Sequence, residues 1–484
     1  MPEAGSDNVG RLRRGLGITV ALAGALALVF VPTGLQHVGE YGARPAYAAA
    51  VAWAMGVLWF TEALPIALTA SLPLVFFPIL GIHGTGLLGD ARAALVPFFD
   101  AYIFLFLGGM ALGAAMEEWS LHRRIALHIM RAVGTEPSRL LMGMLVATAA
   151  VSLWISNTAT AVMMVPIAIA LVKQLERDAR RSLGVYGSVL LLAVAYAANV
   201  GGIGTKIGTA PNSVFAAFVT AQMGIDMGFF EFSALALPFV LLFLPMVWWV
   251  LWRYGRALAP ERGSAREVLD AQLAELGPLA GGERRVAYVF VVAAVLWMLG
   301  DVIRPLIAPR LPFPILAKHY EAAVGCLAGA VLLGTRLLSL NGLWRLPWSS
   351  LVLLGGSLSL AAGMEGSGLA AWLGVRAAAL SAFSPTTQLI FAVTATVAFS
   401  AIASNVATLN VMVNILPRSL PLLFACTIAA SCDFALPAGT PPNAIVFASG
   451  RIRLPDMMRI GVVLDVLAIV VLVVYGRLYL WAFL

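Results

Sequence analysis

The chain has 484 residues, of which 61% are hydrophobic and only 11% are charged, and its mean hydropathy is +0.92. A soluble protein carries about a quarter charged residues, so this composition excludes an ordinary soluble protein. The apolar runs continue for about 20 residues, the length that a membrane helix needs. We therefore predict an all-α membrane protein. The net charge of +7 then indicates topology and gives no reason to expect nucleic acid as a partner.

Cysteine and histidine patterns give no sign of metal or redox chemistry. The three cysteines lie in apolar segments without a C-x-x-C spacing, and the five histidines include no H-E-x-x-H pair. We also find no Ser/His, paired-Asp or zinc constellation with catalytic spacing. We therefore expect no enzymatic activity and no cofactor other than transported ions.

The N-terminal region, 1–45, is predicted to hold a polar, basic tail and a first span at about 16–36. Arg11, Arg13 and Arg14 before the apolar run resemble a signal peptide, but no convincing cleavage site follows. We therefore expect this span to be retained and the N-terminus to lie in the cytoplasm.

A first repeat is predicted over 46–252. Within it, the segment 137–171 is interrupted by Ser156-Asn157-Thr158. Polar side chains are costly in lipid unless they line a protein cavity, so we expect a re-entrant hairpin there. Four glycines and a proline then interrupt the segment 186–222, which we predict to be a broken helix.

The hydrophilic segment 253–285 is predicted to be a cytoplasmic linker, and a second repeat covers 286–484. This half contains a second hairpin at 386–420, with Ser404-Asn405 at its polar break, and a second broken helix at 422–449. Three landmarks recur in the same order in the two halves: Gly108-Gly109 and Gly355-Gly356, Ser156-Asn157 and Ser404-Asn405, Gly208-Thr209-x-Pro211-Asn212 and Gly439-Thr440-x-Pro442-Asn443. If the basic loops lie in the cytoplasm and the chain has about 11 spans, the second repeat starts on the opposite side of the membrane from the first. The two repeats are therefore predicted to be inverted.

The two hairpin tips and the two broken helices are expected to meet at mid-membrane. Helix N-termini there favour an anion. Hydroxyl and carbonyl oxygens suit a hard cation such as sodium. A site of this kind can bind an anion together with co-transported cations.

Five motifs resemble those of a known family. They are Thr61-Glu62-Ala63-Leu64-Pro65, Ile155-Ser156-Asn157-Thr158-Ala159-Thr160, Gly208-Thr209-Ala210-Pro211-Asn212, Ser404-Asn405-Val406-Ala407-Thr408 and Leu436-Pro437-Ala438-Gly439-Thr440-Pro441-Pro442-Asn443. Together they resemble the divalent anion/sodium symporter (DASS) family, which includes the INDY-type dicarboxylate transporters. The resemblance covers the chain from about residue 46 to its end.

The resemblance implies a homodimer in membrane lipid, with an elevator-type transport domain that moves against a scaffold. It implies a substrate site formed by Ser156, Asn157, Thr158, Thr209, Ser404, Asn405, Val406 and Thr440. It also implies two sodium sites, one on Ser152, Ser156, Asn157 and Gly208 and the other on Ser400, Asn405 and Gly439.

Two charged residues depart from the family pattern and are candidates for ion coupling. Lys206 stands where members carry an apolar or small residue, and Asp433 stands where alanine is usual. A buried charge is costly if unpaired. We expect either a Lys206–Asp433 pair or a lysine that reaches into a water-filled cavity. Alternatively, the ammonium of Lys206 replaces a sodium ion, which would favour exchange or proton coupling.

We predict a secondary active transporter in a bacterial inner membrane that moves C4-dicarboxylates such as succinate, malate or fumarate, driven by sodium or by exchange. Sulfate or another divalent oxyanion is the alternative substrate. An ion channel is a rival class, but paired interrupted hairpins favour alternating access. Conductance without substrate saturation would support the channel. An intramembrane enzyme is a third class, for which the catalytic constellation is missing.

Overall fold

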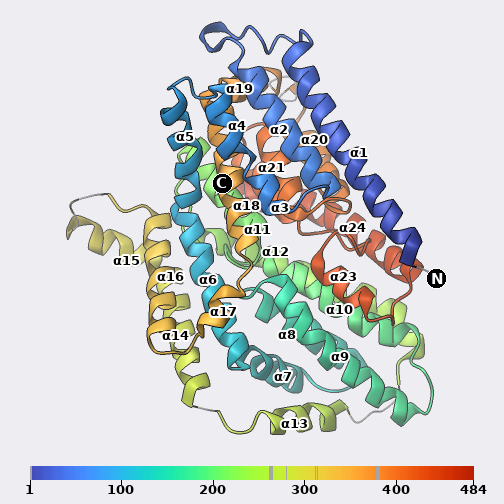
Figure 1. Cartoon of the computed structure of the whole chain (residues 1–484). Coiled ribbons are helices and arrows are strands. Elements are labelled where there is room, and N and C mark those ends of the chain that lie inside the picture. Colours follow the sequence, from blue (N-terminus) through green and yellow to red (C-terminus); the bar gives the residue numbers. More distant parts are fainter. Residues whose placement is uncertain (1–2, 261–264, 280, 311, 313, 378–381) are drawn as a thin grey trace.

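The computed structural model describes residues 3–260, 265–279, 281–310, 312, 314–377 and 382–484. Every regular element within these ranges is helical, so the all-α prediction is confirmed (Figure 1). The predicted linker at 253–285 includes residues 261–264 and 280, which lie outside the described residues.

The described part of the first half, from residue 3, contains twelve α-helices before the linker. They are α1 (Glu3–Phe30), α2 (Arg44–Thr61), α3 (Ile66–Ala70), α4 (Leu72–Leu80), α5 (Leu87–Leu95), α6 (Ala101–Glu118), α7 (Leu121–Val133), α8 (Pro137–Ser152), α9 (Asn157–Ala179), α10 (Val185–Gly202), α11 (Ala210–Met223) and α12 (Phe229–Gly255). The described part of the predicted polar tail at residues 1–15 is helical, because α1 begins at Glu3 and continues into the first predicted span. The segment 3–30 contains no proline that would interrupt the helix.

The described part of the second half begins with a helix inside the linker. Its helices are α13 (Ala265–Glu275), α14 (Gly281–Met298), α15 (Gly300–Ile307), α16 (Ala317–Gly334), α17 (Leu340–Trp344), α18 (Trp348–Gly366), α19 (Leu369–Ala377), α20 (Pro385–Ser400), α21 (Asn405–Ile415), α22 (Leu420–Ala429), α23 (Pro441–Ala448), α24 (Leu454–Tyr475) and α25 (Trp481–Phe483). Helix α13 packs against α7, where Arg123 lies 3.1 Å from Glu275 and Arg131 lies 3.1 Å from Asp270. The linker is therefore docked on the first half.

Fewer helices than predicted are long enough to cross a membrane without interruption. Among the described residues, five helical segments qualify by length and composition: Leu87–Glu118, Asn157–Ala179, Val185–Gly202, Phe229–Leu258 and Leu454–Phe483. A sixth qualifies if α14 and α15, which are bent by 73°, count as one span. The prediction of about 11 spans is not confirmed in this form, because several predicted spans fold as shorter helices, such as α3 and α4.

Both polar breaks fold as a tip between two helices that pack against each other, α8 with α9 and α20 with α21. Ser156 is the N-cap of α9, and its Oγ accepts a hydrogen bond from the backbone N–H of Ala159 at 3.3 Å. Ser404 caps α21 in the same way through Ala407, also at 3.3 Å. Because serine is a favoured N-cap, each motif ends the break and starts a helix.

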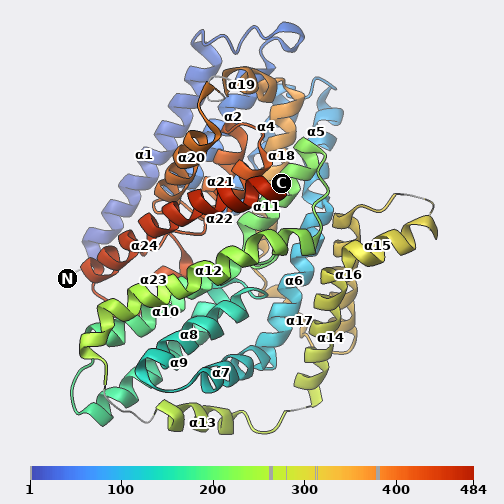
Figure 2. The same cartoon turned by 180° about the vertical axis from the view of Figure 1, so that it is seen from behind.

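The helices pack in two groups. Helix α10, which is almost wholly buried, packs on α8, α9, α12 and α23, and α12 lies along α24 (Figure 2). We call α8–α10, α12 and α20–α24 the α10 group. Helix α6 packs closely on α16, and α18 packs on α3–α5. We call α2–α6 and α14–α18 the α6 group. Helix α11 contacts helices of both groups.

The contact between α6 and α16 depends on glycine. A Cβ atom on Gly108 would lie 2.4 Å from Gly325 Cα, which is backbone and cannot move aside. A Cβ atom on Gly329 would lie 3.8 Å from the Ala111 Cβ, an ordinary contact. We expect Gly108→Ala to cost about 1–3 kcal/mol of stability, as overpacking does, and Gly329→Ala to have little effect. Thermal unfolding of the two purified variants checks this expectation, and equal melting temperatures would contradict it.

Candidate functional site

The two tips and the two broken helices line one cavity of about 850 Å³. All eight residues predicted for the substrate site lie on its wall: Ser156, Asn157, Thr158, Thr209, Ser404, Asn405, Val406 and Thr440. Gly208 and Gly439, from the predicted cation sites, line it as well. Segments from both halves of the chain therefore line a single cavity.

The tip asparagines have equivalent surroundings in the two halves. Ser152 Oγ lies 2.8 Å from Asn157 Oδ1 and 2.7 Å from the carbonyl oxygen of Ala198. Ser400 Oγ lies 3.1 Å from Asn405 Oδ1 and 2.6 Å from the carbonyl oxygen of Ala430. Among the described residues, none accepts a hydrogen bond from the Nδ2 of either asparagine. Each tip therefore offers an amide donor at the cavity.

A second pair of asparagines, which we did not predict to have a role, holds the broken segments together. Asn212 Nδ2 donates to the carbonyl oxygens of Gly202, Ile203 and Thr205 at 3.0, 3.1 and 2.7 Å. Asn443 Nδ2 donates to the carbonyl oxygens of Asp433 and Leu436, both at 3.0 Å. Carbonyl groups freed by the break are thereby satisfied inside the protein, as a membrane interior requires. The two asparagines occupy the same place in the repeated Gly-Thr-x-Pro-Asn motif, and this repetition could have predicted their shared role.

The helices that follow the breaks begin at the cavity. Thr209 and Thr440 are N-caps with nearly equal backbone angles (φ −143° and ψ 147°, φ −134° and ψ 150°), and proline occupies the first turn in both helices. Thr440 Oγ1 accepts hydrogen bonds from Asn199 Nδ2 at 3.0 Å and from the backbone N–H of Asn443 at 3.4 Å. Four helix N-termini, those of α9, α11, α21 and α23, thus border one cavity, and their dipoles favour an anion.

The predicted cation sites contain oxygen ligands of the kind that sodium prefers. In the first half, a Cβ atom on Gly208 would lie 2.5 Å from the Gly202 carbonyl oxygen, and one on Gly202 would lie 2.3 Å from Asn157 Oδ1. This close packing of oxygens around glycines fits a small cation and leaves no room for side chains. The described residues contain no group of three or more His, Cys, Asp or Glu side chains that could hold a metal ion.

One end of the cavity carries ionisable residues. Glu118, His122 and Arg345 line it there, at the end formed by α6, α7 and α17. Burial lowers the pKa of His122, so its imidazole is neutral at pH 7, and its Nδ1–H donates to the Met116 carbonyl oxygen at 2.9 Å. Arg345 is exposed at this end.

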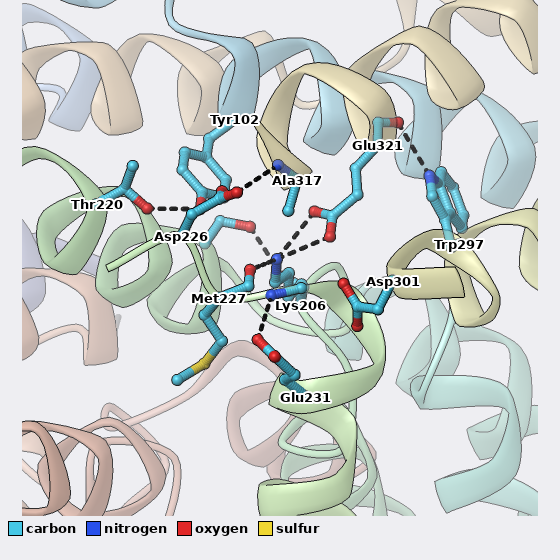
Figure 3. Close-up of polar contacts among 12 residues, drawn as sticks. Tyr102, Lys206, Thr220, Asp226, Met227, Glu231, Trp297, Asp301, Ala317 and Glu321 are labelled. Atoms are coloured by element: carbon cyan, nitrogen blue, oxygen red, sulfur yellow. Dashed lines mark hydrogen bonds and ion pairs between the residues drawn. The ribbon is translucent and has the colours of Figure 1, made fainter. Parts of the chain in front are cut away.

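The predicted pairing of Lys206 with Asp433 is wrong. Lys206 Nζ lies 2.9 Å from both carboxylate oxygens of Glu321 on α16 and also donates to the Met227 carbonyl oxygen (Figure 3). The Lys206 and Glu321 side chains are 0% and 2% exposed, and the ring of Tyr102 lies 5.6 Å from Nζ. The unwound segment turns this lysine toward α6 and α16, so it does not line the cavity. The pair ties the break of the α10 group to the α6 group.

Asp433 has a different environment. It lies in the second break and is 1% exposed, and neither carboxylate oxygen has a hydrogen-bond partner among the described residues. A Cβ atom on Gly439 would lie 2.4 Å from Asp433 Oδ2, so the carboxylate lies against a residue of the predicted second cation site.

The fold and the cavity define a membrane transporter, and comparisons with known proteins identify the class. The family described as "Sodium:sulfate symporter transmembrane region" matches residues 13–484, and the chain belongs to this family. The class is one of secondary transporters and not of enzymes.

Particular relatives have named activities. The chain is 33% identical to the "Sodium-dependent dicarboxylate transporter SdcS" of Staphylococcus saprophyticus, covering 97% of this chain and 91% of the relative. It is 31% identical to the protein of the same name from Staphylococcus aureus strain USA300, covering 89% and 85%. The crystal structure of the Alcanivorax borkumensis YdaH transporter is similar in fold, with a TM-score of 0.53 and 15% identity over 91% of this chain and 99% of that chain.

Proposed function

We propose that this protein is a sodium-coupled secondary active transporter of C4-dicarboxylates such as succinate, malate or fumarate in a bacterial plasma membrane. The observation that carries the proposal is the single cavity formed by both Ser-Asn tips and by four helix N-termini. The names of the SdcS relatives support the substrate class. The family description favours sulfate as the second candidate.

The donor groups suit a molecule with two carboxylates. Asn157 Nδ2 and Asn405 Nδ2 come from different tips, so each is placed to bind one end of the same dianion. The hydroxyl groups of Ser156, Thr158, Ser404 and Thr440 and the backbone at Thr209 and Val406 complete the proposed substrate site. Val406 lacks the hydroxyl of Thr158, which makes the two halves of the site unequal.

Sodium ions would be held by oxygens of Ser152, Ser156, Asn157 and Gly208 in the first half and of Ser400, Asn405 and Gly439 in the second half. Bound sodium would offset the negative charge of the substrate. We favour this arrangement over replacement of a sodium ion by Lys206, because both carboxylate oxygens of Glu321 hold the ammonium away from the cavity.

We propose that transport moves the α10 group, with α11, as an elevator against the α6 group. The two inverted repeats, 46–252 and 286–484, would contribute one re-entrant tip each. With the N-terminus in the cytoplasm, the cavity end at Glu118 and Arg345 faces the cytoplasm. Helices α14 and α15 expose apolar side chains to lipid or to a second copy in a homodimer, among them Val291, Val292, Val302 and Leu306.

Uptake of radiolabelled succinate into proteoliposomes tests the function. We expect saturable uptake that depends on an inward sodium gradient and that unlabelled malate or fumarate inhibits more strongly than sulfate. Potassium and pH gradients, and vesicles loaded with dicarboxylate, are tested separately. Uptake that requires internal dicarboxylate and does not depend on sodium would indicate exchange and not symport. Stronger inhibition by sulfate than by malate or fumarate would indicate that sulfate is the substrate.

A further inference from the structure

Asp433 is a buried carboxylate that the proposed function leaves without a role. The Asp433 side chain has no ion-pair or hydrogen-bond partner among the described residues, although the residue is 1% exposed. Leaving a charged group unpaired inside a membrane protein is costly. The neighbouring carboxylate Asp465, on α24, differs because its Oδ1 accepts a hydrogen bond from the backbone N–H of Phe434 at 2.8 Å. Asp433 therefore lacks a partner that its neighbour has.

The internal repeat shows where the Asp433 side chain is placed. Asn212 binds the carbonyl oxygen of Gly202, and Asn443 binds that of Asp433, each ten residues earlier in the chain. Asp433 is thus the counterpart of Gly202, just as Gly439 is the counterpart of Gly208.

In the first half, a side chain at position 202 would face the tip that carries Asn157. A side chain at residue 202 would begin 2.3 Å from Asn157 Oδ1, and glycine leaves that space to the surrounding oxygens. In the second half, Asp433 Oδ2 lies 2.4 Å from where a Cβ of Gly439 would be, and the carbonyl oxygen of Ala401 lies 3.4 Å from the same point. The carboxylate therefore enters the oxygen cluster next to the tip of Ser400 and Asn405.

We propose that Asp433 is a charged ligand of a monovalent cation held between the second tip and Gly439. The cation site in the second half then carries a full negative charge, whereas the corresponding site in the first half has only neutral oxygens. The number of charged ligands sets the affinity of an oxygen site for a hard cation. The second half therefore binds its cation more tightly than the first.

The negative charge of Asp433 also determines the order in which the cation and the dicarboxylate bind. A dicarboxylate that enters the cavity before the cation would meet the uncompensated carboxylate of Asp433, and like charges repel. The cation therefore binds first and neutralises this half of the site. This step rests on the proposed sodium-coupled function, whereas the cation site itself does not require transport of any particular anion.

Thermal unfolding of the purified full-length protein tests the cation site without a transport measurement. Sodium chloride is titrated against choline chloride at constant ionic strength and fixed pH for the wild type, Asp433→Asn and Asp433→Ala. Asp456→Asn, on the same helix α24 as Asp465, is the matched control, because Asp456 pairs with the exposed Arg453 at 2.8 Å and does not contact Asp433. We expect the sodium concentration for half-maximal stabilisation to rise about tenfold or more in both Asp433 variants and to stay unchanged in the control.

A second expected result distinguishes a cation ligand at Asp433 from a purely structural role of this residue. Without sodium, Asp433→Asn is expected to melt at a higher temperature than the wild type, because the substitution removes an unpaired buried charge. A sodium midpoint within about twofold of the wild type in the Asp433 variants would overturn the proposal. So would wild-type stabilisation that follows pH and ignores sodium. Sodium stabilisation that depends on Asp433, in a protein that transports no dicarboxylate, would leave the cation site standing and overturn the proposed substrate.

Discussion

Replacing Glu321 by alanine is expected to destabilise the protein by about 3–5 kcal/mol, the largest loss expected for any single substitution described above. The variant leaves the ammonium of Lys206 buried, with the Met227 carbonyl oxygen and the ring of Tyr102 as its remaining contacts. The nearby carboxylate of Asp301 interacts with Lys206 but makes no ion pair with it. A buried charge without a countercharge costs far more than the intact pair contributes. Thermal unfolding and gel filtration of the purified variant measure the loss.

Two controls separate this explanation from general damage to α16. The double variant Lys206→Met/Glu321→Leu removes both charges and is expected to regain most of the lost stability, as apolar replacements of buried pairs often do. Glu275→Ala breaks the exposed contact with Arg123 and should change the melting temperature little. A Glu321→Ala variant as stable as the wild type would show that Lys206 is not held as described.

Substitution of either tip asparagine by alanine is expected to weaken dicarboxylate affinity by about 10–100-fold. A hydrogen bond to a charged group contributes about 1.5–3 kcal/mol, and each substitution removes one such donor. The two effects should be similar, because Asn157 and Asn405 bind opposite ends of one substrate in the proposed function. The KM for succinate in proteoliposomes measures the loss.

Asn410→Ala is the matched control for this prediction. Asn410 lies on α21 with Asn405, but its Nδ2 donates to Ser357 Oγ at 2.7 Å and it does not line the cavity. We expect it to lower stability and to leave the KM near that of the wild type. An Asn405→Ala variant with an unchanged KM, beside a defective Asn157→Ala variant, would mean that only one tip binds substrate.

The sequence was sufficient to predict the two tips and the two breaks. Three neighbouring polar side chains at 156–158, and glycines with proline at 201–211, interrupt apolar runs, and lipid does not tolerate such interruptions unless protein covers them. The repetition of both features in the same order predicted that they belong together, and the cavity contains residues of all four segments.

The partner of Lys206 could not be predicted in the same way. Contact between residues 206 and 321 depends on how the first break is oriented against α16, and no periodicity along the chain reports that orientation. The acid Glu321, which is followed by an apolar run in α16, was the available signal, since a buried lysine requires a countercharge. The choice of Asp433 relied instead on the two departures from the family pattern.

The predicted number of spans was not confirmed for a related reason. Hydropathy measures how apolar a segment is, but helix ends are set locally, as where Gly81 ends α4 with φ +64° or where α14 and α15 bend by 73°. The linker helix α13 was not predicted because its segment is largely hydrophilic. The helix docks through the buried side chains of Ala265 and Leu269 as well as through ion pairs with α7.

Equilibrium binding of radiolabelled succinate to the purified protein in sodium tests most directly whether the two halves build one substrate site. The account predicts one succinate bound per chain, with binding weakened by Asn157→Ala and equally by Asn405→Ala, and lost when choline replaces sodium. Two succinate molecules per chain, with each asparagine substitution removing only one of them, would contradict it.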